Sequence, residues 1–228
     1  MRKMVLIALM VLPLFADFFP ETTHTYIESV KGDKVTLHTP FANKGMSGMV
    51  IHKFGDSLFA NLGYLIPTKE KKHFIFSAQT SLEHPTLPTI KTAPSVKDKV
   101  IGGYLYHNVL LLAPNTEVYK NLTSRYNKTW INPDLFALFL AKIDEAIPTK
   151  ENLKTFAKQQ QVGLIYIVKK DKAILFDPIS GERVATQPLR NTIKEPAQYP
   201  FFTYFDFTNE SFFGSKKTGN YFQVMEAF

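Results

Sequence analysis

The chain has 228 residues, with 27 Lys and Arg against 20 Asp and Glu, a formal net charge of +7, and no cysteine. The absence of cysteine excludes a disulfide scaffold, a CxxC zinc site, a thiol nucleophile and a diacylated lipid anchor. With 45% hydrophobic and 21% charged residues, the composition is that of a chain that buries a core rather than that of a disordered one.

The first residues have the pattern of a secretory signal peptide. Arg2 and Lys3 precede an apolar run over residues 4–15, and the small residue Ala16 follows. The run is shorter than the roughly 20 residues that a membrane span needs. We therefore expect export, removal of residues 1–16 after Ala16, and a mature chain without a transmembrane span.

Residues 17–108 have the pattern of a small β-rich domain. β-Branched and aromatic residues recur in short runs between Gly and Asp turns, and no helical period is present. We expect these runs to form a barrel or sandwich. The predicted strands lie at residues 24–30, 34–38, 48–54, 57–66 and 73–79, with a further one after residue 96.

The pattern changes from residue 109, and residues 109–207 predict an α/β domain. The continuous apolar run 109–113 is typical of a strand covered on both faces. Asn115 and Asn132 are expected to cap helices, with Pro133 at the first turn of the second one. That second helix is apolar on nearly every face, so we expect it to be deeply covered. The predicted order β-α-β-α-α-β-β-β is completed by a short strand at Trp130-Ile131, a third helix that opens at Pro148-Thr149, and strands at 164–168, 173–177 and 182–186.

The C-terminal region is rich in Phe and Tyr. Residues 201–207, FFTYFDF, are expected to form a strand that closes one of the sheets, and residues 208–228 to form an aromatic tail. The predicted fold class is therefore α+β, with a small barrel-like N-terminal part followed by an α/β layer and a C-terminal aromatic strand.

No motif for catalysis or for a cofactor is present in the sequence. The chain contains no GxSxG elbow, no GxGxxG or GxxxxGK[ST] glycine loop and no HExxH, although residues 45–48 fall one residue short of the elbow. We therefore expect no enzyme, no cofactor and no metal site. The six histidines lie outside ligand spacing, at His24, His38, His52, His73, His84 and His107.

Three short lysine clusters carry part of the positive charge, at residues 69–72, 169–172 and 216–217. Solvated loop lysines and attraction for an acidic partner both explain such clusters. Nucleic acid is disfavoured as a partner, because the chain is predicted to be exported and has no basic groove motif.

Several segments together resemble the N-terminal domain of bacterial plasminogen-binding proteins, and the likeness extends from the signal to about Phe207. The most distinctive is INPDLFA followed by PT and VGLI. The segments are GMSGMVIHKF (45–54), VKDKVIGGYLYHNVLLLAP (96–114, which includes VLLLAPN with Asn115), INPDLFALFLA (131–141), PTKENLKTFAKQQQVGLIYI (148–167) and LFDPISG (175–181).

The resemblance implies a non-catalytic, exported bacterial surface protein that captures host plasminogen through lysines, with a role in host interaction and virulence. Plasminogen kringles recognise a lysine ammonium, a carboxylate and the methylene stem between them. The given sequence ends in Phe228, and an internal lysine beside an acidic residue can imitate this pair of charges. Lys69, Lys71 and Lys72 next to Glu70 are the best placed. The alternative is a periplasmic or outer-membrane-associated structural or assembly factor that does not bind plasminogen.

Overall fold

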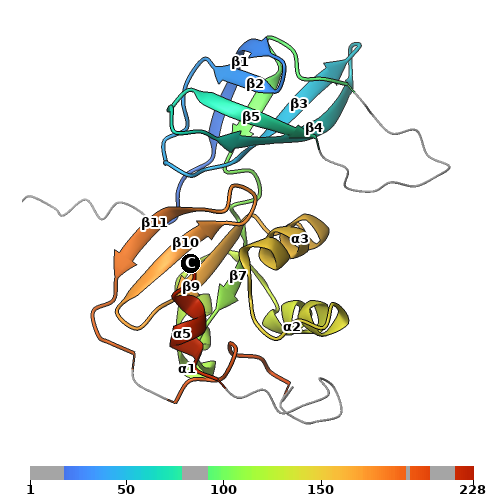
Figure 1. Cartoon of the computed structure of the whole chain (residues 1–228). Coiled ribbons are helices and arrows are strands. Elements are labelled where there is room, and N and C mark those ends of the chain that lie inside the picture. Colours follow the sequence, from blue (N-terminus) through green and yellow to red (C-terminus); the bar gives the residue numbers. More distant parts are fainter. Residues whose placement is uncertain (1–17, 79–91, 194–195, 206–218) are drawn as a thin grey trace, which may run out of the picture.

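The computed structural model describes residues 18–78, 92–193, 196–205 and 219–228. The predicted signal peptide, His84 and Lys216-Lys217 lie outside these residues. Figure 1 shows a barrel above a second sheet that carries the helices. The α+β class with an N-terminal barrel, predicted from the sequence, is confirmed.

The N-terminal part is a closed antiparallel barrel with the strand order β1-β2-β5-β4-β3-β6. Closure pairs both edges of the sheet, so that no strand of the barrel is left with an open edge. Ile27, Val35, Leu37, Val50 and Leu65 fill its interior and are fully buried. The strands are β1 (Thr23–Lys31), β2 (Lys34–Leu37), β3 (Gly48–Phe54), β4 (Leu58–Pro67), β5 (His73–Ala78) and β6 (Lys99–Gly102).

The second sheet is mixed, with the order β11-β10-β9-β7-β8. β7 lies parallel to β8 and to β9, whereas β10 lies antiparallel to β9 and to β11. Its strands are β7 (Asn108–Leu112), β8 (Thr129–Ile131), β9 (Leu164–Val168), β10 (Lys172–Asp177) and β11 (Glu182–Pro188).

Helices cover both faces of this sheet, as the apolar run of β7 predicts. Val109 and Leu111 face a cluster that includes α1 (Thr116–Arg125) and continues into the barrel core. Leu110 and Leu112 face the opposite cluster, which is built by α2 (Pro133–Lys142), α3 (Lys150–Gln160) and α5 (Tyr221–Met225). Alternate residues of a strand point to opposite faces, so a strand covered on both faces must be apolar throughout.

The helices α1, α2 and α3 begin where the sequence predicts. The side chain of Asn115 accepts a hydrogen bond from the backbone N–H of Val118 (3.0 Å), and Asn132 accepts one from Asp134 (2.9 Å). Thr149 starts α3 in a reciprocal capping box with Asn152. Each side-chain oxygen satisfies a backbone donor that the first helical turn leaves unpaired.

The expected deep burial of α2 is wrong. Phe136 and Leu140 are buried, but Leu135 and Leu138 are 46% and 42% exposed. α2 packs with its buried side in the cluster on one face of the sheet, and in the described part of the chain no helix covers its other side. The apolar composition of α2 therefore predicted more burial than a helix in the outer layer has.

The predicted C-terminal strand, residues 201–207, is also wrong over residues 201–205. Residues 201–205 are irregular, and residues 206–207 lie outside the described part. Phe202 N donates to Ala113 O (2.8 Å), whereas Tyr204 N donates to the Asp134 carboxylate (2.8 Å). The backbone donors of this segment contact separate elements one by one, so no strand ladder forms.

The end of the predicted aromatic tail is part of the core. α5 buries Tyr221, whose hydroxyl donates to Leu112 O (2.8 Å) and Val168 O (2.7 Å). Lys169, expected as a solvated loop lysine, is 2% exposed, and its Nζ donates to the main-chain oxygen of Phe228 (2.9 Å). The C-terminal helix therefore covers a lysine that sequence alone places in solvent.

Candidate functional site

The three predicted lysines lie on the turn between β4 and β5. The hydroxyl of Thr68 donates to His73 O (2.8 Å) and accepts from Glu70 N (3.2 Å), and His73 N donates to Glu70 O (3.1 Å). These bonds fix the turn, while Lys69, Lys71 and Lys72 are all exposed. The turn therefore presents ammonium groups on an ordered backbone.

Glu70, the carboxylate among these lysines, has a partner of its own. Its Oε2 lies 2.8 Å from Nδ1 of His73, and the two side chains are 76% and 49% exposed. Such an exposed pair contributes at most about 1 kcal/mol and exchanges readily for another partner. Among the described residues, none of the three lysines forms an ion pair.

A groove of about 350 Å³ separates this turn from the loop between β2 and β3. Lys69 and Lys71 line it from one side and Lys44 from the other, whereas Lys72 does not line it. Apolar side chains and prolines form much of the remaining wall, at Pro40, Phe41, Met46, Pro67 and Phe74.

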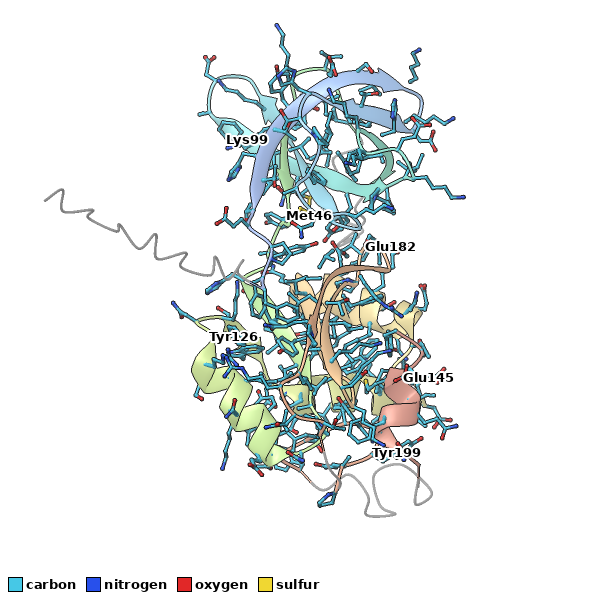
Figure 2. All side chains as sticks on the ribbon, turned by 90° about the vertical axis from the view of Figure 1, so that its left-hand side faces the viewer. Met46, Lys99, Tyr126, Glu145, Glu182 and Tyr199 are labelled. Atoms are coloured by element: carbon cyan, nitrogen blue, oxygen red, sulfur yellow. The ribbon has the colours of Figure 1, made fainter. Side chains whose placement is uncertain are left out.

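The groove continues into a wider hollow of about 660 Å³ at the junction of the barrel with the second sheet. Lys44 and Lys69 line this hollow together with Glu182 and Arg183 of β11. The guanidinium of Arg183 donates to the main-chain oxygen of Phe228. The cations that line the groove itself are Lys44, Lys69 and Lys71. Figure 2 shows Met46 and Glu182 on the two sides of the junction.

A buried carboxylate at the end of β10 fixes the two walls to each other. Asp177 Oδ2 accepts from Ser47 N (2.7 Å) and from the hydroxyl of Tyr106 (2.7 Å), and Oδ1 accepts from Ile179 N (2.8 Å) and Ser180 N (3.0 Å). Burial raises the pKa of Asp177, and these donors oppose that shift. Burial and the neighbouring Asp177 charge raise the pKa of Tyr106 well above its usual value.

Gly45 brings the barrel loop against β11. Its φ is +82°, and a Cβ atom at this position would lie 2.7 Å from the main-chain oxygen of Arg183. The hydroxyl of Ser180 also donates to Gly45 O (2.6 Å). The segment that falls short of a nucleophile elbow is therefore a contact between the two parts of the fold, and glycine is required for the close approach.

Lys44 was not predicted from the sequence. Lys72 was grouped with Lys69 and Lys71, although it does not line the groove. Lys44 is isolated in the sequence, so no cluster marked it, and the fold brings it to the groove from a separate loop. The residue pattern Gly45-Met46-Ser47-Gly48 was the available signal, because it indicates a tight turn at this position.

The histidines in the described part of the chain are dispersed. His52 Nδ1 lies 2.7 Å from the buried Asp98 carboxylate, and His38 stacks on Tyr26 at 4.5 Å. In the described ranges, no three His, Asp or Glu side chains gather as metal ligands would. No helix in those same ranges is long and apolar enough to cross a membrane.

These features define an α+β protein in which a closed barrel and a mixed sheet meet at a lysine-lined groove. The chain belongs to the family described as plasminogen-binding protein pgbA N-terminal, whose model matches residues 22–227. This match confirms the resemblance found in the sequence. Neither the curated proteins nor the solved structures include a significant match to the chain.

Proposed function

We propose that the protein binds plasminogen through internal lysines, and that Lys69 and Lys71 are the residues that kringles recognise. Membership of the family supports the partner. The observation that carries the choice of residues is the fixed turn on which two exposed lysines flank one carboxylate at the edge of a groove.

The chemistry of the turn fits kringle recognition. A kringle pocket needs an ammonium, a carboxylate and a methylene stem that packs against aromatic walls. Lys69 or Lys71 supplies the ammonium and the stem, and Glu70 supplies the carboxylate. Since the Glu70–His73 pair is exposed, its exchange for a kringle cation costs little.

Surface plasmon resonance of the purified protein on immobilised plasminogen tests this proposal, with and without a free lysine analogue. We expect saturable binding that the analogue abolishes and that Lys69→Ala with Lys71→Ala weakens at least tenfold. Lys31→Ala with Lys34→Ala is the matched control, because these lysines also flank a carboxylate, Asp33, on a hairpin turn.

The outcomes separate the site from the function. Analogue-sensitive binding that survives Lys69→Ala with Lys71→Ala would keep plasminogen as the partner and reject this turn. Absence of binding at micromolar concentration would reject the function and favour a structural or assembly role in the bacterial envelope.

The proposal includes export and display on the cell surface, and a non-catalytic role. The signal-like residues 1–16 support export. Protease added to intact cells should remove a surface protein, whereas a periplasmic one should be protected until the outer membrane is opened.

A further inference from the structure

The hairpin of β3 and β4 ends in two large apolar side chains that are exposed. Leu58 and Phe59 are each 61% exposed. The hairpin turn has Gly55 at a φ of +60°, and Phe54 pairs with Leu58 across it. In Figure 1 this hairpin lies at the end of the barrel away from the second sheet.

The two side chains point to opposite faces of the hairpin. Leu58 is opposite Phe54, and Phe59 is opposite Lys53, and neighbouring residues of a strand alternate between faces. Each face of the tip therefore carries one large apolar side chain. A groove on a protein partner covers one face of a hairpin, whereas the interfacial region of a bilayer surrounds both.

Exposed lysines lie at the same end of the barrel as the tip. The β1–β2 turn reaches this end because β1 and β3 both run toward it, and the segment before β6 starts there. Among the residues that the structure describes, the exposed cations at this end are Lys31, Lys34, Lys53, Lys97 and Lys99, and the exposed carboxylates are Glu28, Asp33 and Asp56. Lysines beside an apolar tip complement the negative charge of phosphate headgroups.

From the exposed apolar tip and the nearby lysines we infer that the end of the barrel away from the second sheet docks on an anionic lipid surface. Leu58 and Phe59 are inserted at the headgroup level. β4 separates this tip from the lysine turn at its other end by roughly 30 Å, at about 3.3 Å per residue. A docked barrel therefore leaves Lys69 and Lys71 accessible. The inference does not depend on plasminogen binding.

Sedimentation with vesicles tests the docking. The purified protein is mixed with vesicles of phosphatidylcholine alone, or of equal parts phosphatidylcholine and phosphatidylglycerol. We expect binding to the anionic vesicles that salt weakens. Leu58→Ser with Phe59→Ser should lower the partition constant at least about tenfold, and Lys53→Gln about fivefold.

Tyr204→Ser with Phe205→Ser is the matched control. These residues are 58% and 63% exposed, and they lie next to α2 in the other part of the fold. The control variant should bind as the unmodified protein does. Unchanged binding of the Leu58→Ser, Phe59→Ser variant, or equal binding to both kinds of vesicle, would overturn the inference.

Insertion can be measured directly, because the chain has no cysteine. Phe59→Cys carries an environment-sensitive fluorophore at the tip, and Phe205→Cys carries it at the control position. Anionic vesicles should shift the emission of the first label to shorter wavelength and leave that of the second unchanged. The same spectrum at Phe59→Cys with and without vesicles would contradict insertion, whatever the sedimentation result.

Discussion

The hydroxyl of Tyr106 donates a 2.7 Å hydrogen bond to Oδ2 of Asp177, and this bond connects the segment between the two sheets to the end of β10. The same carboxylate oxygen accepts from Ser47 N, which belongs to the barrel loop. Asp177 is fully buried, so its loss leaves donors without water to replace it. This carboxylate therefore connects the barrel loop to the second sheet beside the lysine groove.

We expect Asp177→Asn to lower the free energy of unfolding by about 2–3 kcal/mol. An amide has one acceptor oxygen in place of two, so two of the four donors lose their acceptor: Ser47 N–H and the Tyr106 hydroxyl if the NH2 group replaces Oδ2. Tyr106→Phe removes one donor and should cost about 1 kcal/mol. Chemical denaturation measures both values, and equal stability of Asp177→Asn and the unmodified protein would contradict the assigned role.

The pH dependence of this contribution has a defined sign. Burial raises the pKa of Asp177 above its usual 3.8, so the folded state binds more protons than the unfolded state between the two values. Its stability contribution is therefore full below about pH 3.8 and falls as pH rises through the raised value. The difference in stability between the unmodified protein and Asp177→Asn should shrink over that rise.

A buried tyrosine makes the fold sensitive to alkali. Burial, followed by the charges of Tyr204 and Asp134, raises the pKa of Tyr119 from 10.0 to about 12. The folded state holds the phenol proton more tightly, so stability is lost as pH rises from about 10 toward 12. Tyr119→Phe should lose less stability over this range in denaturation series at several pH values. A parallel loss in both proteins would contradict the shift.

Local signals predicted much of the fold. Caps such as Asn115 and Asn132 act within one helical turn, so the sequence reveals them directly. Packing between segments that are distant in the sequence could not be predicted from such local signals. The cover of α2, the irregular path of residues 201–205 and the burial of Lys169 all depend on segments that are distant in sequence.

The candidate site shows the same difference between residues that are adjacent in the sequence and residues that only the fold brings together. Lys69 and Lys71 were found because they are adjacent to Glu70 in sequence. Lys44 was missed because the fold alone brings it to the groove. Asp177 lies at the end of the predicted strand 173–177, and nothing in the sequence shows that Tyr106 and Ser47 converge on it.

Gly163 marks a second close contact at the junction. A Cβ atom there would lie 2.1 Å from the main-chain oxygen of Leu105, in the segment that connects the two sheets. Backbone cannot yield as a flexible side chain does, so Gly163→Ala should cost about 3 kcal/mol or more of unfolding free energy. Gly32→Ala is the control, with open space around it and a cost of about 1 kcal/mol from its positive φ. Similar costs for both variants would reject the steric explanation.

The carboxylate of Glu70 is expected to take part in plasminogen binding. If the lysine turn imitates a free lysine, Glu70→Gln removes the negative end and should weaken binding about fivefold, while the ammonium groups stay. Asp33→Asn is the matched control, because Asp33 also lies between two lysines on a barrel turn. Surface plasmon resonance on plasminogen compares the two variants. Equal affinity for Glu70→Gln and the unmodified protein would show that the lysines act without this carboxylate.

His73 provides the complementary test, because its ring nitrogen lies 2.8 Å from Glu70 and competes for the same carboxylate. His73→Ala should therefore tighten plasminogen binding, by no more than about fivefold, since an exposed pair is worth at most about 1 kcal/mol. The main-chain bonds of the turn do not involve the imidazole, so its backbone should remain in place. Weaker plasminogen binding by His73→Ala would contradict this competition. It would mean that the histidine orients the Glu70 carboxylate for the kringle.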